Sequence, residues 1–472
     1  MNSRLLRLAA ALSMVALIAV PSFAARGTAT FTSFVAIGDS YGAGFQSAAL
    51  NINHQPYSWP AVIAKQVGLK ICPPEATATD SCFALPLISF PGLGSSNELQ
   101  LNDIVSYPPV IVPASGTAAP MMLAFGRPYN DLAVPGYTVG ATMAFTGKEA
   151  NSGLGQVILR GLGSEVDQAI AQKPTFIAIW IGGNDFLGSV SNGTSLGLTS
   201  TADFTAQYGA MLDKLIAGAP QAGIVVGTLP ASFSGVPFVS TVSRFIINPA
   251  TRTPVLGPDG NPIAMIATLD GTTVGQIPAG SYVTLGASSF MASGYGIPST
   301  LAAVPPFNQL PNAGKPLPGA VVITPTEASA IQAQITDYNN IIKQAASSRN
   351  IPIADITGLF NRVGAKQEFV GPLSITGDFI TGGFFSLDGI HLTDLGYTLF
   401  ANEFIKAINS GYGTHIPLSS AAQFLANNAT TSGLPFFQST PWQMSSQAGT
   451  ALMQMFSLAP APSPVRYRAT HH

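Results

Sequence analysis

Short apolar runs alternate with longer segments whose apolar residues recur at helical spacing. Bounded by Gly, Pro or Asp and rich in β-branched and aromatic residues, the short runs predict buried strands. Four such runs cover residues 31–37, 175–181, 223–229 and 351–356. Helices are predicted at Ser58–Val67, Gly155–Gln172, Phe204–Ala217, Thr324–Ser348 and Thr393–Asn409. This alternation indicates an α/β layer fold with a mainly parallel sheet.

Two stretches interrupt the alternation, and both are rich in Gly and Pro. Residues 70–128 and 233–322 are interpreted as insertions that decorate the sheet edges within one domain spanning residues 26–413. The remaining segment, 414–472, is weakly patterned and contains the run Pro-Ala-Pro-Ser-Pro at 460–464. We expect this C-terminal tail to be partly disordered.

The first residues have the pattern of an export signal. Arg4 and Arg7 precede an apolar run from Leu8 to Val20, and small residues occupy the last and third-last positions before the expected cleavage site, Ala24 and Ser22. This predicts a signal peptide over residues 1–24, cleaved after Ala24 or the next residue, and a secreted, periplasmic or cell-envelope location. An uncleaved membrane anchor is the alternative. Later apolar runs are too short for a stable transmembrane span, which needs about 20 residues.

The chain has only two cysteines, Cys72 and Cys82, in a loop-like stretch. Because disulfides persist in oxidising compartments, the predicted export favours a local disulfide between them. A metal site is disfavoured, since no histidine lies nearby.

Charge and composition exclude several classes of protein. Charged residues make up 9% of the 472 residues, hydrophobic residues make up 47%, and the formal net charge is -2. The chain therefore lacks the excess of basic residues that nucleic-acid binding requires. It also has enough apolar side chains to form a core, which argues against a disordered protein. Coiled coils, which need many Glu, Lys and Arg, are also disfavoured.

Histidine is rare, and His391 is the only one of the five with an acid three positions before it, Asp388. A carboxylate on one ring nitrogen would fix the tautomer and leave the other nitrogen as a base. Ser40 follows a predicted strand in Gly-Asp-Ser, where backbone N–H groups can hold a developing oxyanion. Each motif alone also fits an ordinary turn.

Two further turns offer hydrogen-bond donors. Asn184 follows a strand and two glycines, and Gly136 ends the run from Asn130. A side-chain amide and a glycine N–H can both stabilise an oxyanion. Ser195 matches Gly-x-Ser-x-Gly but lacks the preceding strand that a nucleophile elbow needs, so we exclude it.

Together the four motifs resemble those of the SGNH hydrolases, the GDSL-type lipases and esterases, and look closest to secreted bacterial members. The matching blocks are Gly38–Ser40, Asn130–Gly136, Gly182–Asp185 and Asp388–His391. The resemblance implies a flavodoxin-like three-layer α/β/α sandwich. One departure is Leu392, where many relatives have Pro, and this position does no chemistry.

The resemblance also implies roles for individual residues. Ser40 would be the nucleophile, His391 the base, and Asp388 the residue that orients it. The N–H groups of Ser40 and Gly136 and the amide of Asn184 would form the oxyanion hole, and no metal or organic cofactor would be needed. Asp39 and Asp185 are expected to brace their turns instead.

The implied activity is that of an exported carboxylic-ester hydrolase, either an esterase or a lipase. Its substrate would be a small-molecule or lipid ester, and a lipid substrate would bring the protein into transient contact with a lipid surface. An acyltransferase or a carbohydrate O-deacetylase with the same triad is an alternative, and so is a non-catalytic surface or binding protein on the same fold. Apolar residues of the second insertion either line a pocket for acyl chains or form a structural β excursion, and the sequence leaves both open. These residues are Phe238, Phe245, Met265, Tyr282, Phe290, Met291 and Tyr295.

Overall fold

A computed structural model describes residues 25–103, 109–149, 153–241, 243–249, 251–269 and 271–422. The predicted signal peptide and most of the predicted tail lie outside these ranges. Within them, no helix has both the length and the apolar character that crossing a membrane requires.

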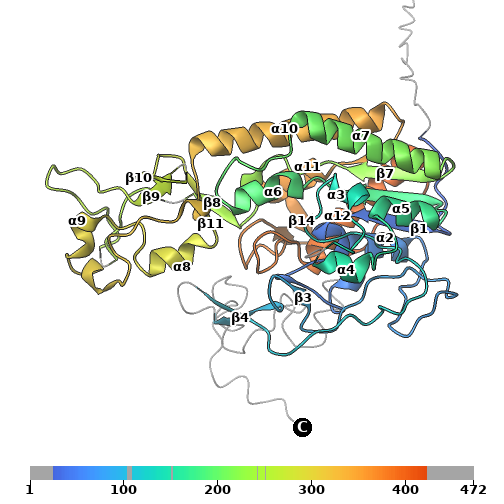
Figure 1. Ribbon diagram of the computed structural model, residues 1–472, viewed down its shortest axis with the longest axis horizontal. Helices are drawn as coiled ribbons and strands as arrows, with labels where there is room; N and C mark the ends of the chain where they lie inside the picture. Colours follow the sequence, from blue (N-terminus) through green and yellow to red (C-terminus); the bar gives the residue numbers. More distant parts are fainter. Residues whose placement is uncertain are drawn as a thin grey trace, which may run out of the picture.

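A parallel sheet forms the centre of the fold (Figure 1). Its strand order is β1 (Phe34–Gly38), β6 (Phe176–Trp180), β7 (Gly223–Gly227) and β13 (Ile353–Ala354). Every residue of β1, β6 and β7 is buried, which explains why these strands are apolar throughout and do not alternate.

The segment 130–134 widens the sheet by pairing with the edge of β1 that faces away from β6. The N–H of Ala36 donates to the carbonyl of Asn130 at 2.9 Å, and the N–H of Leu132 donates back to the carbonyl of Ala36 at 3.0 Å. The chain leaving β1 thus returns on one side of it, whereas β6 lies on the other. Such a reversal is the topological switch point, where open α/β sheets bind ligands beyond the carboxyl ends of their strands.

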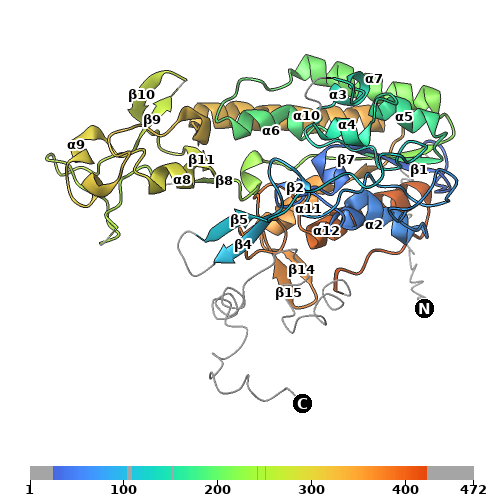
Figure 2. The ribbon, with the colours of Figure 1, turned by 60° about the horizontal axis from the view of Figure 1, so that its bottom comes forward.

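Helices cover both faces of the sheet, as Figures 1 and 2 show. One layer contains α2 (Trp59–Gln66), α11 (Ile356–Gly364) and α12 (Asp394–Tyr412), and the other contains α5 (Glu165–Ala171), α7 (Thr201–Gly218) and α10 (Pro325–Ser347). The predicted three-layer α/β/α sandwich is confirmed. At the start of α10, Thr324 and Glu327 form the expected capping box.

The prediction of one helix over Gly155–Gln172 is wrong. The segment contains α4 (Leu154–Ile158) and α5, with an irregular connection between them. Arg160, Gly161 and Gly163 have φ values of 54°, 71° and 127°, which a right-handed helix cannot accommodate. The apolar spacing continues across the break because both helices bury apolar side chains, such as Ile158 in α4 and Val166 in α5.

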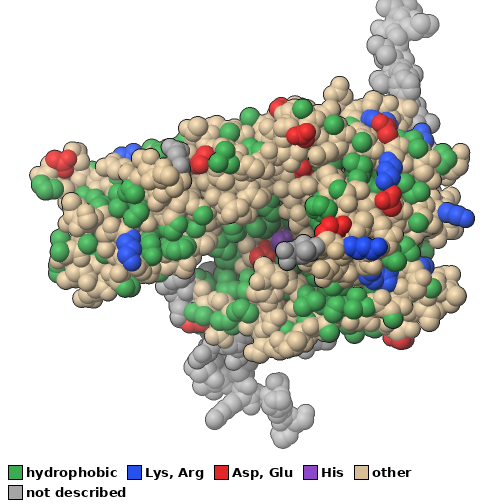
Figure 3. All heavy atoms as spheres, in the orientation of Figure 1, with side chains coloured by type: hydrophobic (Ala, Val, Ile, Leu, Met, Phe, Trp, Pro, Cys, Tyr) green, Lys and Arg blue, Asp and Glu red, His purple; other side chains and the backbone are tan. Residues whose placement is uncertain are grey.

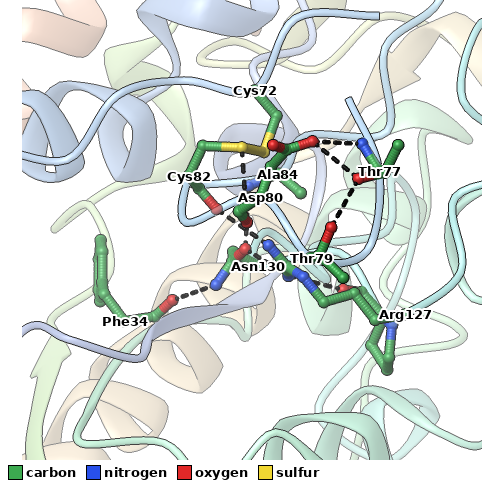
Figure 4. Close-up of a disulfide and its surroundings, with 10 residues drawn as sticks. Phe34, Cys72, Thr77, Thr79, Asp80, Cys82, Ala84, Arg127 and Asn130 are labelled. Atoms are coloured by element: carbon green, nitrogen blue, oxygen red, sulfur yellow. Dashed lines mark hydrogen bonds between the residues drawn. A yellow bond between two sulfur atoms is a disulfide. The ribbon is translucent and has the colours of Figure 1, made fainter. Parts of the chain in front are cut away.

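The first insertion contains the Cys72–Cys82 disulfide, as predicted (Figure 4). Arg127 donates to the Cys82 carbonyl at 3.0 Å and to Asn130 Oδ1 at 2.8 Å. Asn130 Nδ2 in turn donates to the Phe34 carbonyl at 2.9 Å. The disulfide loop is thereby fixed to β1. The insertion also contains β3 (Leu93–Gly94), which pairs with β2 (Ala49–Leu50), and the hairpin of β4 (Leu99–Asp103) and β5 (Val110–Pro113).

The second insertion extends away from the sandwich as a lobe, at the left of Figure 1. We call residues 239–322 the inserted lobe. It has its own apolar cluster, which includes Met265, Ile297, Phe307 and Leu317. Its elements are β8 (Val239–Thr241), β9 (Ile266–Leu269), β10 (Thr273–Gln276), β11 (Tyr282–Thr284), α8 (Ala287–Ala292) and α9 (Ser299–Ala302), and β11 lies between β8 and β12 (Val322–Ile323).

The remaining described elements are short, and α1 and α6 directly follow the ends of β1 and β6. They are α1 (Ser40–Ala43), α3 (Ala141–Ala144), α6 (Asn184–Ser191), β14 (Glu368–Val370), β15 (Leu373–Ile375) and the 3-10 helices η1 (Gln55–Tyr57), η2 (Phe233–Gly235), η3 (Phe307–Gln309) and η4 (Gly319–Val321).

Candidate functional site

Ser40 is the first residue of α1, directly beyond the carboxyl end of β1. Asp39 caps this helix by accepting a hydrogen bond from the N–H of Tyr41 at 3.0 Å. A Cβ atom on Gly38 would lie 2.6 Å from the carbonyl oxygen of Trp180, so only glycine allows the ends of β1 and β6 to approach this closely. At the first position of a helix, the N–H of Ser40 has no partner within the helix and can bind a ligand.

The Asp388–His391 turn faces this serine. His391 Nε2 lies 2.8 Å from Ser40 Oγ, and His391 Nδ1 lies 2.9 Å from Asp388 Oδ2. Asp388 Oδ1 also accepts hydrogen bonds from the N–H groups of Ile390 and His391, at 2.9 and 2.8 Å. Burial opposes ionisation of Asp388, but the His391 ring and these N–H groups hold its pKa well below the usual range. The ring is thus oriented by a carboxylate that is ionised at neutral pH.

Gly136 and Asn184 lie beyond the two segments that flank β1. Gly136 follows the 130–134 segment and has a φ of 87°, a left-handed conformation that favours glycine. Asn184 begins α6, just after β6, and its Nδ2 donates to the carbonyl of Tyr137 at 2.9 Å. The structure therefore places Ser40, Gly136 and Asn184 at the carboxyl ends of three adjacent parallel segments.

The side chains that we expected to brace turns do so. Asp39 caps α1, and Asp185 accepts from the N–H of Val139 at 3.0 Å and from the hydroxyl of Thr199 at 2.7 Å. Asp185 thereby also links its own turn to the loop after Gly136. Ser195 lies beyond the end of α6 and follows no strand, so it lacks the geometry of a nucleophile elbow.

A small apolar pocket opens beside Ser40. Figure 3 shows the hollow on this face of the molecule, lined by hydrophobic side chains, with a histidine at its floor. The apolar lining residues are Tyr41, Trp180, Phe186, Leu187, Val190, Pro230, Phe233, Val236 and Ile390.

The second insertion contributes to this pocket only through its first residues. Phe233 and Val236 line it, and Tyr282 packs edge-on against Phe233, with 5.4 Å between ring centroids. Phe245, Met265, Met291 and Tyr295, which we considered for an acyl pocket, line a separate pocket of about 460 Å³ in the inserted lobe. Phe290 packs on Tyr295 within the lobe, at 5.2 Å. Phe238 donates its N–H to the carbonyl of Gly389, inside the Asp388–His391 turn, at 2.8 Å.

A buried charged cluster near the site was missed by the sequence analysis. His54 Nδ1 lies 3.1 Å from Asp394 at the start of α12, and His54 Nε2 lies 3.4 Å from Glu98 in the first insertion. Burial would lower the pKa of His54, but the two carboxylates raise it to about 10. Only a long-range pairing signal could have found this cluster, because both acids are distant along the chain.

Comparison with solved structures finds similar proteins at low sequence identity. The extracellular lipase from Streptomyces rimosus is 13% identical, with a TM-score of 0.33, over 80% of this chain and 99% of the lipase. The family 3 carbohydrate esterase from Clostridium thermocellum is 11% identical, with a TM-score of 0.31, over 80% of this chain and 94% of the esterase. Phospholipase A1 from Streptomyces albidoflavus is 14% identical, with a TM-score of 0.31, over 81% of this chain and all of the phospholipase.

No curated protein matches the chain. The model of the family described as GDSL-like Lipase/Acylhydrolase, however, matches residues 34–404, which include all four motifs and both insertions. The chain therefore belongs to the GDSL-like lipase/acylhydrolase family and is a carboxylic ester hydrolase.

Proposed function

We propose that the protein is an exported hydrolase of esters that have an apolar acyl group, acting through an acyl-enzyme on Ser40. The observation that carries this proposal is the continuous relay Ser40 Oγ–His391 Nε2–Asp388, with distances of 2.8 and 2.9 Å, beside an apolar pocket.

In the acylation step, Ser40 Oγ attacks the ester carbonyl carbon while its proton moves to His391 Nε2. Asp388 stabilises the resulting imidazolium, and the N–H groups of Ser40 and Gly136 and the Asn184 amide bind the oxyanion. Collapse of this intermediate breaks the bond to the alcohol oxygen, which takes the proton from His391. Water, deprotonated by the same histidine, then attacks the acyl carbon of the acyl-enzyme. Collapse of this second intermediate breaks the bond to Ser40 Oγ, which takes the proton back from His391, and the acid is released.

The lining of the pocket supports an acyl group longer than acetyl. Trp180, Phe186, Val190, Phe233 and Val236 present apolar surface, and burial of each methylene contributes about 0.8 kcal/mol, or about fourfold in binding. We therefore expect kcat/KM to rise with acyl chain length until the pocket is full.

Two observations support export. Residues 1–24 have the pattern of a signal peptide, and the Cys72–Cys82 disulfide suits an oxidising compartment. Cell fractionation with N-terminal sequencing of the exported protein tests this, and we expect the mature chain to begin after Ala24 or Ala25.

The catalytic assignment is tested with a fluorophosphonate probe and with p-nitrophenyl esters of two to sixteen carbons. We expect labelling and turnover in the native protein and in Ser195→Ala, and neither in folded Ser40→Ala. Labelling that persists in Ser40→Ala would contradict the assignment. Adding an alcohol acceptor and analysing the products separates hydrolysis from acyl transfer, and we expect free acid as the main product.

A further inference from the structure

Glu165 is a fully buried acid that contacts the end of β1, two residues before Ser40. It is the first residue of α5 and has 0% of its surface exposed. Its Oε2 accepts a hydrogen bond from the N–H of Gly38 at 3.0 Å. Glu165 belongs to none of the four motifs.

The carboxyl group lies where two strand ends meet. Gly38 precedes Ser40 by two residues, and Val134 precedes Gly136 by two residues. The N–H of Val134 donates to the carbonyl of Gly38 at 3.0 Å. Glu165 therefore holds the N–H of Gly38 while Val134 holds its carbonyl, so Glu165 fixes the residue that joins the two segments just before they supply the N–H groups of the candidate oxyanion hole.

Stability alone gives little reason for an acid at this position. Burial raises the pKa of Glu165 well above its usual range, and the nearby Asp39 and Asp131 raise it further. Its second oxygen, Oε1, has no hydrogen-bond partner among the described residues. A buried acid without a cation is costly to the fold, whereas an apolar residue of similar size is not.

We propose that Glu165 is a positioning residue that fixes the distance between the N–H groups of Ser40 and Gly136, so that both can bind one oxyanion. The inference rests on the proposed function. Asp185 provides a parallel, since it accepts from Val139 in the loop after Gly136 and lies next to Asn184. Two buried acids, Glu165 and Asp185, thus hold the backbone segments that carry the three candidate donors.

The test compares Glu165→Leu, which removes the acceptor, with Glu165→Gln, which is isosteric with the neutral acid and keeps one oxygen. Gln168→Leu is the matched control. Gln168 lies on the same helix, is 1% exposed, and donates to the carbonyls of Leu159 and Gly163 away from the strand ends. The measurements are kcat and KM, the melting temperature, and the inhibition constant of a trifluoromethyl ketone that forms a tetrahedral adduct on Ser40.

For Glu165→Leu we expect kcat to fall about 10- to 100-fold with KM within about threefold, because a misplaced donor weakens only transition-state binding. The ketone should bind more weakly by a similar factor. Glu165→Gln should stay within about fivefold of native kcat, and Gln168→Leu should lose stability but keep kcat.

The proposal is overturned if Glu165→Leu keeps native kcat and ketone affinity, or if Gln168→Leu loses both to the same extent. If Glu165→Leu does not fold, Glu165→Gln still decides: a loss of kcat as large as that of an Asn184 variant contradicts the proposal. Failure of the proposed function gives a different result, since activity would then survive in Ser40→Ala.

Discussion

The side-chain amide of Asn184 donates a hydrogen bond to the carbonyl of Tyr137, the residue after Gly136, at 2.9 Å. One amide hydrogen thus ties two candidate oxyanion-hole segments together, and the second remains for substrate. We expect Asn184→Ala to lower kcat by about 100- to 1000-fold with little change in KM. Steady-state kinetics on a p-nitrophenyl ester checks this.

Asn192 provides the control for that variant. It lies at the other end of α6, where its amide donates to the carbonyl of Gly188. Asn192→Ala should keep native kcat. Equal losses in both variants would indicate that α6, and not the Asn184 amide, accounts for the effect.

Asp388→Asn should lower kcat by about 10,000-fold, because an amide can stabilise the wrong tautomer of His391. The pKa of Asp388 is held well below its usual range, so the carboxylate stays ionised at every pH above about 4. The variant should therefore be impaired at every pH from 6 to 8. A kcat equal to that of the native protein at any pH in this window contradicts the assigned role.

Narrowing the apolar pocket should change acyl preference. Val236→Trp fills space beside Ser40, so we expect kcat/KM for an ester with an eight-carbon acyl group to fall about tenfold or more. The value of kcat/KM for an acetate ester should stay within about threefold of native. Met291→Trp makes the same addition in the pocket of the inserted lobe and should leave the chain-length profile unchanged. An equal shift in both variants would show that the two pockets act as one.

The His54 cluster should make stability depend on pH. The pKa of His54 is raised from 6.5 to about 10 in the folded protein, so its contribution is complete below pH 6.5 and is lost as pH rises towards 10. The free energy of unfolding should fall over this window by up to about 1.4 kcal/mol per pH unit. Urea denaturation at several pH values measures the slope, and His54→Gln should flatten it. If the free energy of unfolding of His54→Gln depends on pH as steeply as that of the native protein, other titratable groups account for the dependence.

Removing the disulfide should affect stability and not chemistry. For a closed loop of about ten residues, loss of the Cys72–Cys82 bridge should lower the free energy of unfolding by about 2–3 kcal/mol. Denaturation of the double Ser variant, with and without reductant, measures this. A large fall in kcat at 25 °C would show that the loop also supports the site.

The sequence was most informative where strands end. Ser40, Gly136 and Asn184 each follow an apolar run, and parallel strands bring their carboxyl ends together whatever the chain between them does. The break at Arg160–Gly163 was missed because apolar spacing records only which face is buried. Its local signal was the pair Gly161 and Gly163.

Contacts between distant parts of the chain could not be predicted. His54 meets Glu98 and Asp394, which lie 44 and 340 residues further along the chain. Glu165 resembles an ordinary helix-start acid until β1 is placed against it. In the same way, the sequence did not indicate which apolar residues of the second insertion lie near the site. Phe233 and Val236 line the pocket beside Ser40, whereas the inserted lobe has an open pocket of its own.

Phe238 is hydrogen-bonded on both sides: its N–H donates to Gly389, and its carbonyl accepts from Leu285 at 2.7 Å. Gly389 has a φ of 73°, and a Cβ there would lie 2.9 Å from the nitrogen of Phe238. An exchange of the inserted lobe for a shorter linker should therefore place its junction after Phe238. A cut made earlier would release the turn between Asp388 and His391 from its support.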